Sequence, residues 1–289
     1  LNSLPTRIEQ VYSITAEKAA EEKIMIVIGE KINGSIPSVG KAIAGHDEEF
    51  IKKLAKLQSD CGADYIDCCA SVSEAVEAQT LEWMIKAIED AADTPVCVDS
   101  PSPEICVEGI GMCSRPGIVN SVSMEGNKTD VIFPVIADTK WNCIALLCDD
   151  TGIPKTPEKR IEVFKRILEE ADKYGISHDR LFIDPLVVTL STDEEAFTTF
   201  ADTVRQIKEI DPDVHITSGL SNISFGLPKR RIINQAFMIL AAQAGMDSAI
   251  MDPSNQMLTG AAYAADALLG NDEYCMEYIG AYRDGLFGE

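Results

Sequence analysis

The sequence predicts a (β/α)₈ TIM barrel, in which eight parallel strands form a closed ring surrounded by helices. Three observations support this prediction. Short apolar runs rich in β-branched residues alternate along the chain with amphipathic helical patterns. Eight such runs begin about every 32 residues, which suits this architecture. The chain length of 289 residues is also typical of it.

The predicted strands are short runs dominated by Ile, Val, Leu and Cys. They cover residues 24–28, 64–68, 96–99, 118–121, 143–148, 181–184, 215–219 and 247–251. Because strands and helical patterns alternate, the strands are expected to lie parallel in one sheet.

Helices are predicted where apolar residues recur every three or four positions. They cover residues 48–61, 74–91, 157–174, 192–210 and 231–244. In the first of these, Phe50, Leu54 and Leu57 are expected on the face that packs against the strands. Thr156 followed by Pro157 predicts a helix start, since threonine caps an N-terminus and proline suits the first turn.

An open doubly wound sheet is the alternative architecture. Such a sheet usually carries a GxGxxG turn after its first strand, whereas this chain reads GEKING at residues 29–34. The chain shows no linker or break in composition, so residues 1–289 are expected to form one domain. Residues 1–22 would be an N-terminal extension that could form a helix closing the barrel bottom, and residues 271–289 would carry a C-terminal helix.

Composition narrows the classes of function. With 47 acidic and 25 basic residues, the net charge is −22, which argues against nucleic-acid and anionic-membrane partners. No apolar run is long enough to span a bilayer, and no secretion signal is recognisable. The nine cysteines form no CxxC motif and are expected to be reduced thiols of a cytoplasmic protein; a zinc or haem site has little support.

Polar residues recur where the predicted strands end, at the face that carries the active site of TIM barrels. They are Glu30, Asn33, Asp67, Asp99, Ser100, Asn120, Ser121, Asp149, Asp150, Asp184, Ser218, Ser221, Asn222, Asp252 and Asn255. Buried carboxylates need partners, yet cations are scarce at these positions. The partner would therefore be a divalent metal or a flat heterocycle rich in N–H donors.

Each of these residues also has a purely structural interpretation. Asp67 or Asp252 could be a helix cap, and Asn120 with Ser121 could serve a turn. Asp149 and Asp150 could be solvated loop charges. Residues 229–231, Lys-Arg-Arg, could be a solvated helix start or, as in some barrels, a phosphate site.

Six strings in order identify a resemblance. They are GEKING at 29–34, VDS at 98–100, VNS at 119–121, TGIP at 151–154, FIDPL at 182–186 and GLSNIS at 219–224. Over residues 24–285 the chain resembles the pterin-binding (β/α)₈ family. Within that family it is similar to the methyltetrahydrofolate:corrinoid-protein methyltransferases.

Dihydropteroate synthase, the other major branch, is a poorer match. Its pattern shares Asp99, Asn120 and Asp184, but it needs cations after strands 7 and 8 to hold a diphosphate leaving group. At those places this chain reads GLSN at 219–222 and MDPSN at 251–255. A dihydropteroate synthase-like enzyme therefore remains the weaker alternative.

The resemblance implies roles for individual residues. Asp99, Asn120 and Asp184 would bind the pterin edge, and Asn222 would lie near N5, the nitrogen that carries the methyl group. Further contacts are expected from Asp67, Asp149 and Ser221. The family commonly has Asn-Lys where this chain has Asp149-Asp150, and Gln where it has Phe225.

The implied reaction moves a methyl group between N5 of tetrahydrofolate (as 5-methyltetrahydrofolate) and the cobalt of a corrinoid, in either direction. A partner corrinoid protein would bring the cobalamin to the barrel mouth, and residues 186–190, 225–228 and Met257 are candidate rim contacts. The resemblance also implies a homodimer. A magnesium-dependent barrel lyase using Asp67, Asp99, Asp184 and Asp252, or a non-catalytic pterin-binding protein, are the alternatives.

Overall fold

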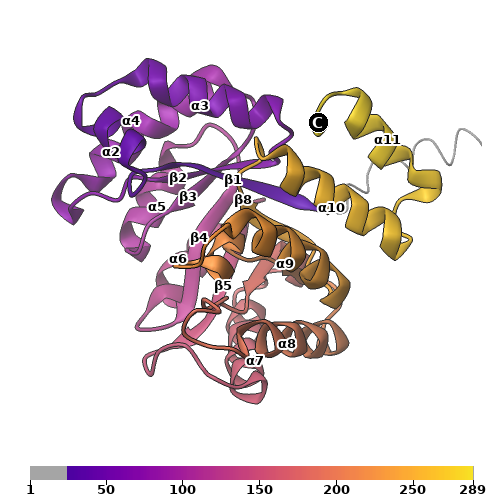
Figure 1. The fold of residues 1–289 in the computed structure, drawn as a ribbon. Coiled ribbons are helices and arrows are strands. Elements are labelled where there is room, and N and C mark those ends of the chain that lie inside the picture. Colours follow the sequence, from indigo (N-terminus) through magenta and orange to yellow (C-terminus); the bar gives the residue numbers. More distant parts are fainter. Residues whose placement is uncertain (1–24, 289) are drawn as a thin grey trace, which may run out of the picture.

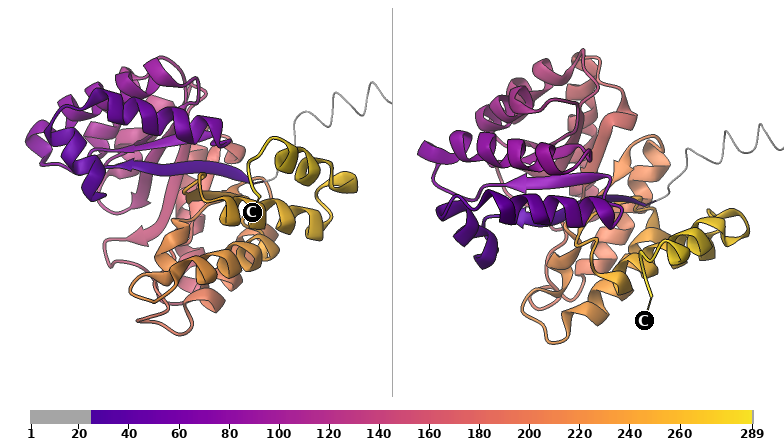
Figure 2. Two further views of the ribbon diagram at one scale, coloured as in Figure 1. Left: turned by 45° about the horizontal axis from the view of Figure 1, so that its top comes forward. Right: turned by 90° about the horizontal axis from the view of Figure 1, so that it is seen from above.

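Eight parallel strands form the centre of the molecule, and helices surround them (Figures 1 and 2). The computed structural model describes residues 25–288, so the predicted N-terminal extension at residues 1–22 lies outside the described residues. The strands are β1 (Ile26–Asn33), β2 (Tyr65–Cys69), β3 (Val96–Asp99), β4 (Ile118–Met124), β5 (Asn142–Asp149), β6 (Leu181–Asp184), β7 (His215–Ile216) and β8 (Ser248–Met251). The (β/α)₈ barrel prediction is confirmed.

The strand order is that of a TIM barrel. It runs β7-β6-β5-β4-β3-β2-β1-β8, with every neighbouring pair parallel. Backbone bonds bring β7 and β8 together: Ile250 N donates to Ser218 O at 2.9 Å, and Asp247 N donates to Ile216 O at 3.3 Å. The alternative of an open doubly wound sheet is therefore wrong.

The helices follow the strands as expected, with more of them than the periodicity predicted. They are α2 (Pro37–Ala44), α3 (Glu48–Asp60), α4 (Glu74–Ala91), α5 (Pro103–Met112), α6 (Lys128–Ile136), α7 (Pro157–Lys173), α8 (Ala196–Ile210), α9 (Arg230–Ala244), α10 (Gln256–Leu269) and α11 (Met276–Arg283). Prediction missed α2, α5, α6 and α10. The C-terminal helix expected within residues 271–289 is α11, which covers 276–283 of the described residues 271–288.

Local chemistry explains where several helices begin. The Asp47 side chain accepts a hydrogen bond from Phe50 N at 3.1 Å, and the Thr156 side chain caps α7 as predicted. The packing face of α3 agrees with the prediction at Phe50 and Leu54, which pack partly buried against the core, and differs from it at Leu57. Its buried residues are Ile51, Ala55 and Gln58, whereas Leu57 is 37% exposed.

The core has two layers, inside and outside the ring of strands. Five side chains fill the barrel interior, at 0–1% exposure: Ile28, Cys97, Ile118, Ile144 and Phe182. The residues beside them along each strand point outward and pack against the helices, as Val96, Val98 and Ile183 do. Because successive side chains of a strand alternate in direction, each strand serves both layers.

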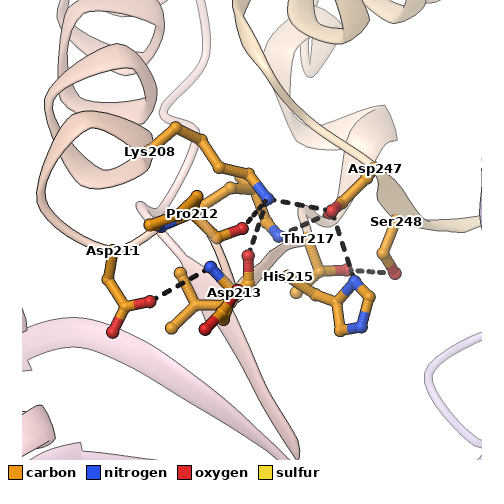
Figure 3. A network of polar contacts seen from close by, with 10 residues as sticks. Lys208, Asp211, Pro212, Asp213, His215, Thr217, Asp247 and Ser248 are labelled. Atoms are coloured by element: carbon orange, nitrogen blue, oxygen red, sulfur yellow. Dashed lines mark hydrogen bonds and ion pairs between the residues drawn. The ribbon is translucent and has the colours of Figure 1, made fainter. Parts of the chain in front are cut away.

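A polar network ties β7 to β8 near the amino ends of the strands (Figure 3). Asp247 accepts bonds from Ile216 N at 2.6 Å, from Lys208 Nζ at 3.0 Å and from His215 Nδ1 at 3.2 Å. Lys208 also donates to Val214 O at 2.7 Å. These contacts hold the pKa of Asp247 below its usual range despite its burial. The charged carboxylate therefore stabilises the junction between β7 and β8.

All nine cysteines are free thiols, five of them buried. Within residues 25–288, no helix is both long enough and apolar enough to cross a membrane.

Candidate functional site

The strands direct five of the predicted polar residues into the barrel mouth. Interior side chains recur every second residue, so the polar layer lies two positions beyond the apolar one. The interior pairs are Ile28 with Glu30, Tyr65 with Asp67, Cys97 with Asp99, Ile118 with Asn120, and Phe182 with Asp184. The apolar members fill the barrel, and the polar members therefore face its carboxyl-end mouth.

Asp67, in the middle of β2, lies close to Asp99, the last residue of β3. Burial raises the pKa of Asp67 well above its usual range, and the charge of Asp99 raises it further. Asp67 hydrogen bonds with Cys97 and Asn120, yet its Oδ1 is buried without a partner within the described residues. Burial also raises the pKa of Asp99 to about 6. Because the two carboxyls interact, the pair stays protonated up to a higher pH than an isolated carboxyl would.

Asp184 is the buried carboxylate of β6. Its Oδ1 accepts from Leu186 N at 2.7 Å, and the Gly219 backbone N–H also donates to it. Burial raises its pKa to about 6, while the two backbone donors and the charge of Arg160 act in the opposite direction. The side chain thus joins the end of β6 to the segment that follows β7.

Sequence reasoning missed Arg160. It lies in the first turns of α7, 3% exposed, and its Nε donates to Pro154 O at 3.0 Å. The signal was present, because Arg160 precedes Phe164 by four residues and so falls on the buried face of α7.

Glu30 lies at the other side of the mouth. Burial and the nearby charge of Asp252 raise its pKa to about 7. Asp252 forms an ion pair with Lys31 at 2.8 Å and accepts from Ser254, whereas Asn255 caps α10. Asp252 is therefore not a helix cap, and neither is Asp67, which is buried in the barrel.

Ser221 and Asn222 lie on a 3₁₀ turn, Leu220–Ser224, directly after β7. Asn222 approaches Gly219 closely, since a Cβ added at Gly219 would lie 2.9 Å from its Nδ2. Because Gly219 also donates to Asp184, the turn brings the Asn222 amide to the same side of the mouth as Asp184. Arg230 Nη2 donates to Ser221 O at 2.6 Å and stabilises the turn.

A cavity of about 710 Å³ opens at the mouth, beside the ends of β1 and β8. It is lined by Glu30, Lys31, Ser221, Arg230, Arg231, Asn234, Asp252, Ser254, Asn255, Gln256 and Met257. Its size suits a small organic ligand, because such pockets commonly measure about 300–1,000 Å³.

Asp149 is placed apart from this group. Its Oδ1 accepts from the Thr151 N–H and hydroxyl, and its Oδ2 pairs with Arg166 at 2.9 Å. It lines a second cavity of about 450 Å³ on the loop before α7. The carboxylate is therefore already engaged in loop structure.

The mouth combines carboxylates of raised pKa, amides and few free cations. Such a set accepts hydrogen bonds from a ligand that presents several N–H groups on one edge. Within residues 25–288, no cluster of three or more His, Cys, Asp or Glu side chains is arranged to hold a metal ion.

Comparison with known proteins agrees with this chemistry. Residues 39–252 match the model of the family described as pterin binding enzyme. The chain is 50% identical over 266 residues to the methylcorrinoid:tetrahydrofolate methyltransferase of Eubacterium limosum, covering 91% of this chain and 98% of that protein.

More distant similarities point the same way. A methionine synthase of Mycobacterium tuberculosis is 27% identical over 83% of this chain, which spans only 21% of that protein. The structure of dihydropteroate synthase from Xanthomonas albilineans, in complex with 7,8-dihydropteroate, shares the fold. It has a TM-score of 0.58 and 19% identity, over 85% of this chain and 92% of that one.

Proposed function

Because the chain belongs to the pterin-binding enzymes, and within them to the methylcorrinoid:tetrahydrofolate methyltransferases, we propose that it transfers a methyl group between a corrinoid protein and N5 of tetrahydrofolate. The observation that carries this proposal is the layer of buried acceptors at the barrel mouth, combined with 50% identity over nearly the whole of that relative. Chemistry at one site does not set the direction, since a catalyst leaves the equilibrium unchanged.

We assign the pterin edge to Asp99, Asn120 and Asp184. The exocyclic amine and the adjacent ring N–H of a pterin form two parallel donors, and one carboxylate can accept both. Asp184 suits this role because it is buried and rigidly held by two backbone donors. Asp67, beside Asp99 and Asn120, would support that pair from below, and its unpartnered Oδ1 is an available acceptor.

Asn222 is the proposed catalytic residue. When 5-methyltetrahydrofolate is the donor, the N5–CH₃ bond breaks, N5 keeps its electron pair and gains a proton, and the methyl group bonds to the Co(I) of the corrinoid substrate, which supplies the electron pair of the new Co–C bond. An amide donating to N5 stabilises the charge that develops there, and such help is typically worth about 10²–10⁴-fold. In reverse, the lone pair of N5 attacks the methyl carbon, the Co–C bond breaks and leaves its electron pair on cobalt, and N5 releases its proton.

The corrinoid supplies the nucleophile or the activated methyl group, so this chain needs none of its own. What the protein contributes is orientation: the acceptors hold the ring while N5 faces the open mouth. Phe225 is 67% exposed and Met257 57% exposed near this mouth, where they would contact the partner corrinoid protein. Ser221 and Asp149 remain proposed further contacts at the rim.

Two further features belong to this proposal. The protein would act as a homodimer, for which the exposed apolar side chains of the C-terminal region offer a surface; Leu268, Tyr274, Met276 and Tyr282 are each at least 62% exposed. Nine free thiols suit a reducing, cytoplasmic setting. Light scattering coupled to size exclusion gives the mass that tests the dimer.

The direct test is stopped-flow spectroscopy of cob(I)alamin. Mixing enzyme, cob(I)alamin and 5-methyltetrahydrofolate should convert the cob(I)alamin spectrum to that of methylcobalamin, and methylcobalamin with tetrahydrofolate should give the reverse change. A parallel calorimetric titration measures folate binding. Folate binding without transfer in either direction would indicate a non-catalytic pterin-binding protein. Absence of folate binding, with magnesium bound stoichiometrically, would favour a lyase.

A further inference from the structure

The cavity of about 710 Å³ beside β1 and β8 is lined by cations that the proposed methyl transfer does not use. Arg230 and Arg231 line it from the first turn of α9, and Lys31 lines it from β1. Lys31 is paired with Asp252 at 2.8 Å, whereas neither arginine forms an ion pair within residues 25–288. In a chain of net charge −22, two uncompensated guanidinium groups in one cavity point to an anionic ligand.

The acidic groups of the cavity do not cancel these charges. Asp252 is offset by Lys31, which leaves Glu30 as the remaining carboxyl of the lining. Burial, and then the nearby charge of Asp252, raise the pKa of Glu30 to about 7, so this carboxyl is only partly ionised at neutral pH. The lining is therefore positive overall, whether Glu30 is ionised or not.

Arg230 is held in place before any ligand arrives. Its Nε donates to Ser224 Oγ at 3.0 Å, its Nη2 donates to Ser221 O at 2.6 Å, and its guanidinium lies 5.9 Å from the centre of the Phe225 ring. Its Nη1 remains for a ligand, and a side chain already held loses little conformational entropy on binding. Asn255 adds a neutral donor, because its side-chain oxygen caps α10 and its NH₂ group is left over.

The cavity lies where the tail of a folate would leave the pterin ring. In the proposed function, Asp99, Asn120 and Asp184 hold the edge of the ring that carries the N–H groups, and Asn222 lies at N5. The neighbouring ring atom, C6, carries the p-aminobenzoyl-glutamate tail. Ser221 directly precedes Asn222 and lines the cavity, so the tail would begin beside the cavity.

We propose that Arg230 and Arg231 bind the carboxylates of the glutamate tail, and that the protein prefers folates whose tail carries several glutamates. This inference rests on the proposed function, because it needs a pterin ring held with N5 at Asn222. A guanidinium matches a carboxylate with two parallel bonds, and each further γ-linked glutamate brings one more carboxylate. A free phosphate could use the same cations, but the position of the cavity beside Asn222 favours an anion that is attached to the ring.

The experiment is calorimetric titration of three ligands into the full chain at pH 7. The ligands are tetrahydropteroate, which lacks glutamate, tetrahydrofolate, which carries one, and its triglutamate form. One partly exposed ion pair can change affinity by about fivefold. The wild type should therefore bind tetrahydrofolate about fivefold more tightly than tetrahydropteroate, and the triglutamate more tightly still. The preference should shrink as salt is added, because ions screen exposed charges.

Arg231 is the residue to change, because Arg230 also holds the turn at Ser221. Arg231→Gln should weaken binding of the triglutamate about fivefold and leave tetrahydropteroate unaffected. Arg231→Lys retains the charge and should keep most of the affinity. Lys155→Gln is the matched control: it removes the same charge from an exposed side chain after β5 that lines the second cavity, so its affinities should follow the wild type.

The outcomes separate this inference from the proposed function. Equal wild-type affinity for tetrahydropteroate and the triglutamate would overturn the inference and leave the proposed function standing. An equal loss for both ligands in Arg231→Gln, or the same loss in Lys155→Gln, would overturn it too. Inorganic pyrophosphate that binds the wild type but not Arg231→Gln, without any preference for glutamate, would assign the cavity to a phosphate-bearing ligand instead. A wild-type chain that binds none of the three pterins would refute the proposed function itself.

Discussion

Replacing Gly219 with alanine moves the proposed catalytic amide without removing it. An added Cβ would lie 2.9 Å from Nδ2 of Asn222, whereas ordinary contact requires about 3.5 Å. The contacting atom is the end of a side chain, so the amide can retreat by about 0.6 Å while the backbone stays in place. Gly219 has φ −66° and ψ 80°, which alanine can adopt.

The expected loss follows from that displacement. A misplacement of about 1 Å can cost about 10²-fold in rate, so we expect methyl transfer to slow about 10-fold. Stability should hold or rise by about 0.4–1 kcal/mol, because alanine restricts the unfolded chain. Single-turnover stopped-flow measures the rate, urea unfolding measures the stability and calorimetry measures folate affinity.

A second glycine provides the matched control. Gly111 lies in α5, and a Cβ added there meets no atom within 4 Å. Gly111→Ala should therefore leave the transfer rate unchanged. If Gly219→Ala transferred methyl groups at the wild-type rate, the position of the Asn222 amide would not matter and the assignment of its role would be wrong.

Three further predictions concern single side chains. Asn222→Ala should lower the transfer rate by about 10²-fold or more while folate affinity changes little; equal losses in both would remove its role at N5. Asp184→Asn should weaken folate binding about 10- to 100-fold by calorimetry, since a charged acceptor becomes a single neutral one. Asp247→Ala should lower the free energy of unfolding at pH 7 by about 1–3 kcal/mol. Because the pKa of Asp247 is depressed, its stabilisation exists above its ordinary pKa of 3.8 and fades as pH falls through the lower folded value, so the two urea curves should converge in acid.

The residues alone were enough to predict the fold and the layer of the site. Strand spacing predicted eight parallel strands, and a barrel places function where strands end. Asp99 and Asp184 could be predicted from the sequence because each is the polar residue at which an apolar run stops. The observed strand bounds agree closely there, with β3 and β6 ending at Asp99 and Asp184 as predicted. Asp67 and Asn120 also interrupt apolar runs, although β2 and β4 continue beyond them to Cys69 and Met124.

The buried face of a helix was harder to predict from the sequence than the position of a strand. The stripe Phe50, Leu54 and Leu57 satisfied the helical period, and Phe50 and Leu54 do pack, partly buried, against the core. Leu57 is exposed, however, and the fully buried residues of α3 are Ile51, Ala55 and Gln58. Gln58 is buried because its Oε1 accepts from Lys31 N at 2.9 Å, at the irregularity in β1. Polar burial of this kind depends on a backbone group from another element, and hydrophobic period carries no information about it.

Which charged side chains lie near one another depends on the tertiary structure and could not be predicted from the sequence. Arg160 and Asp184 come from different β/α units, as do Glu30 and Asp252, and their separations depend on how neighbouring loops pack. The same packing brings Asp149 into an ion pair with Arg166, away from the large cavity. It also places the Asn222 amide next to Gly219. Hydrophobic periodicity indicates only in which direction a side chain points from its own helix or strand. Coulomb energies depend on distances between backbones, and these are defined only once the barrel has closed.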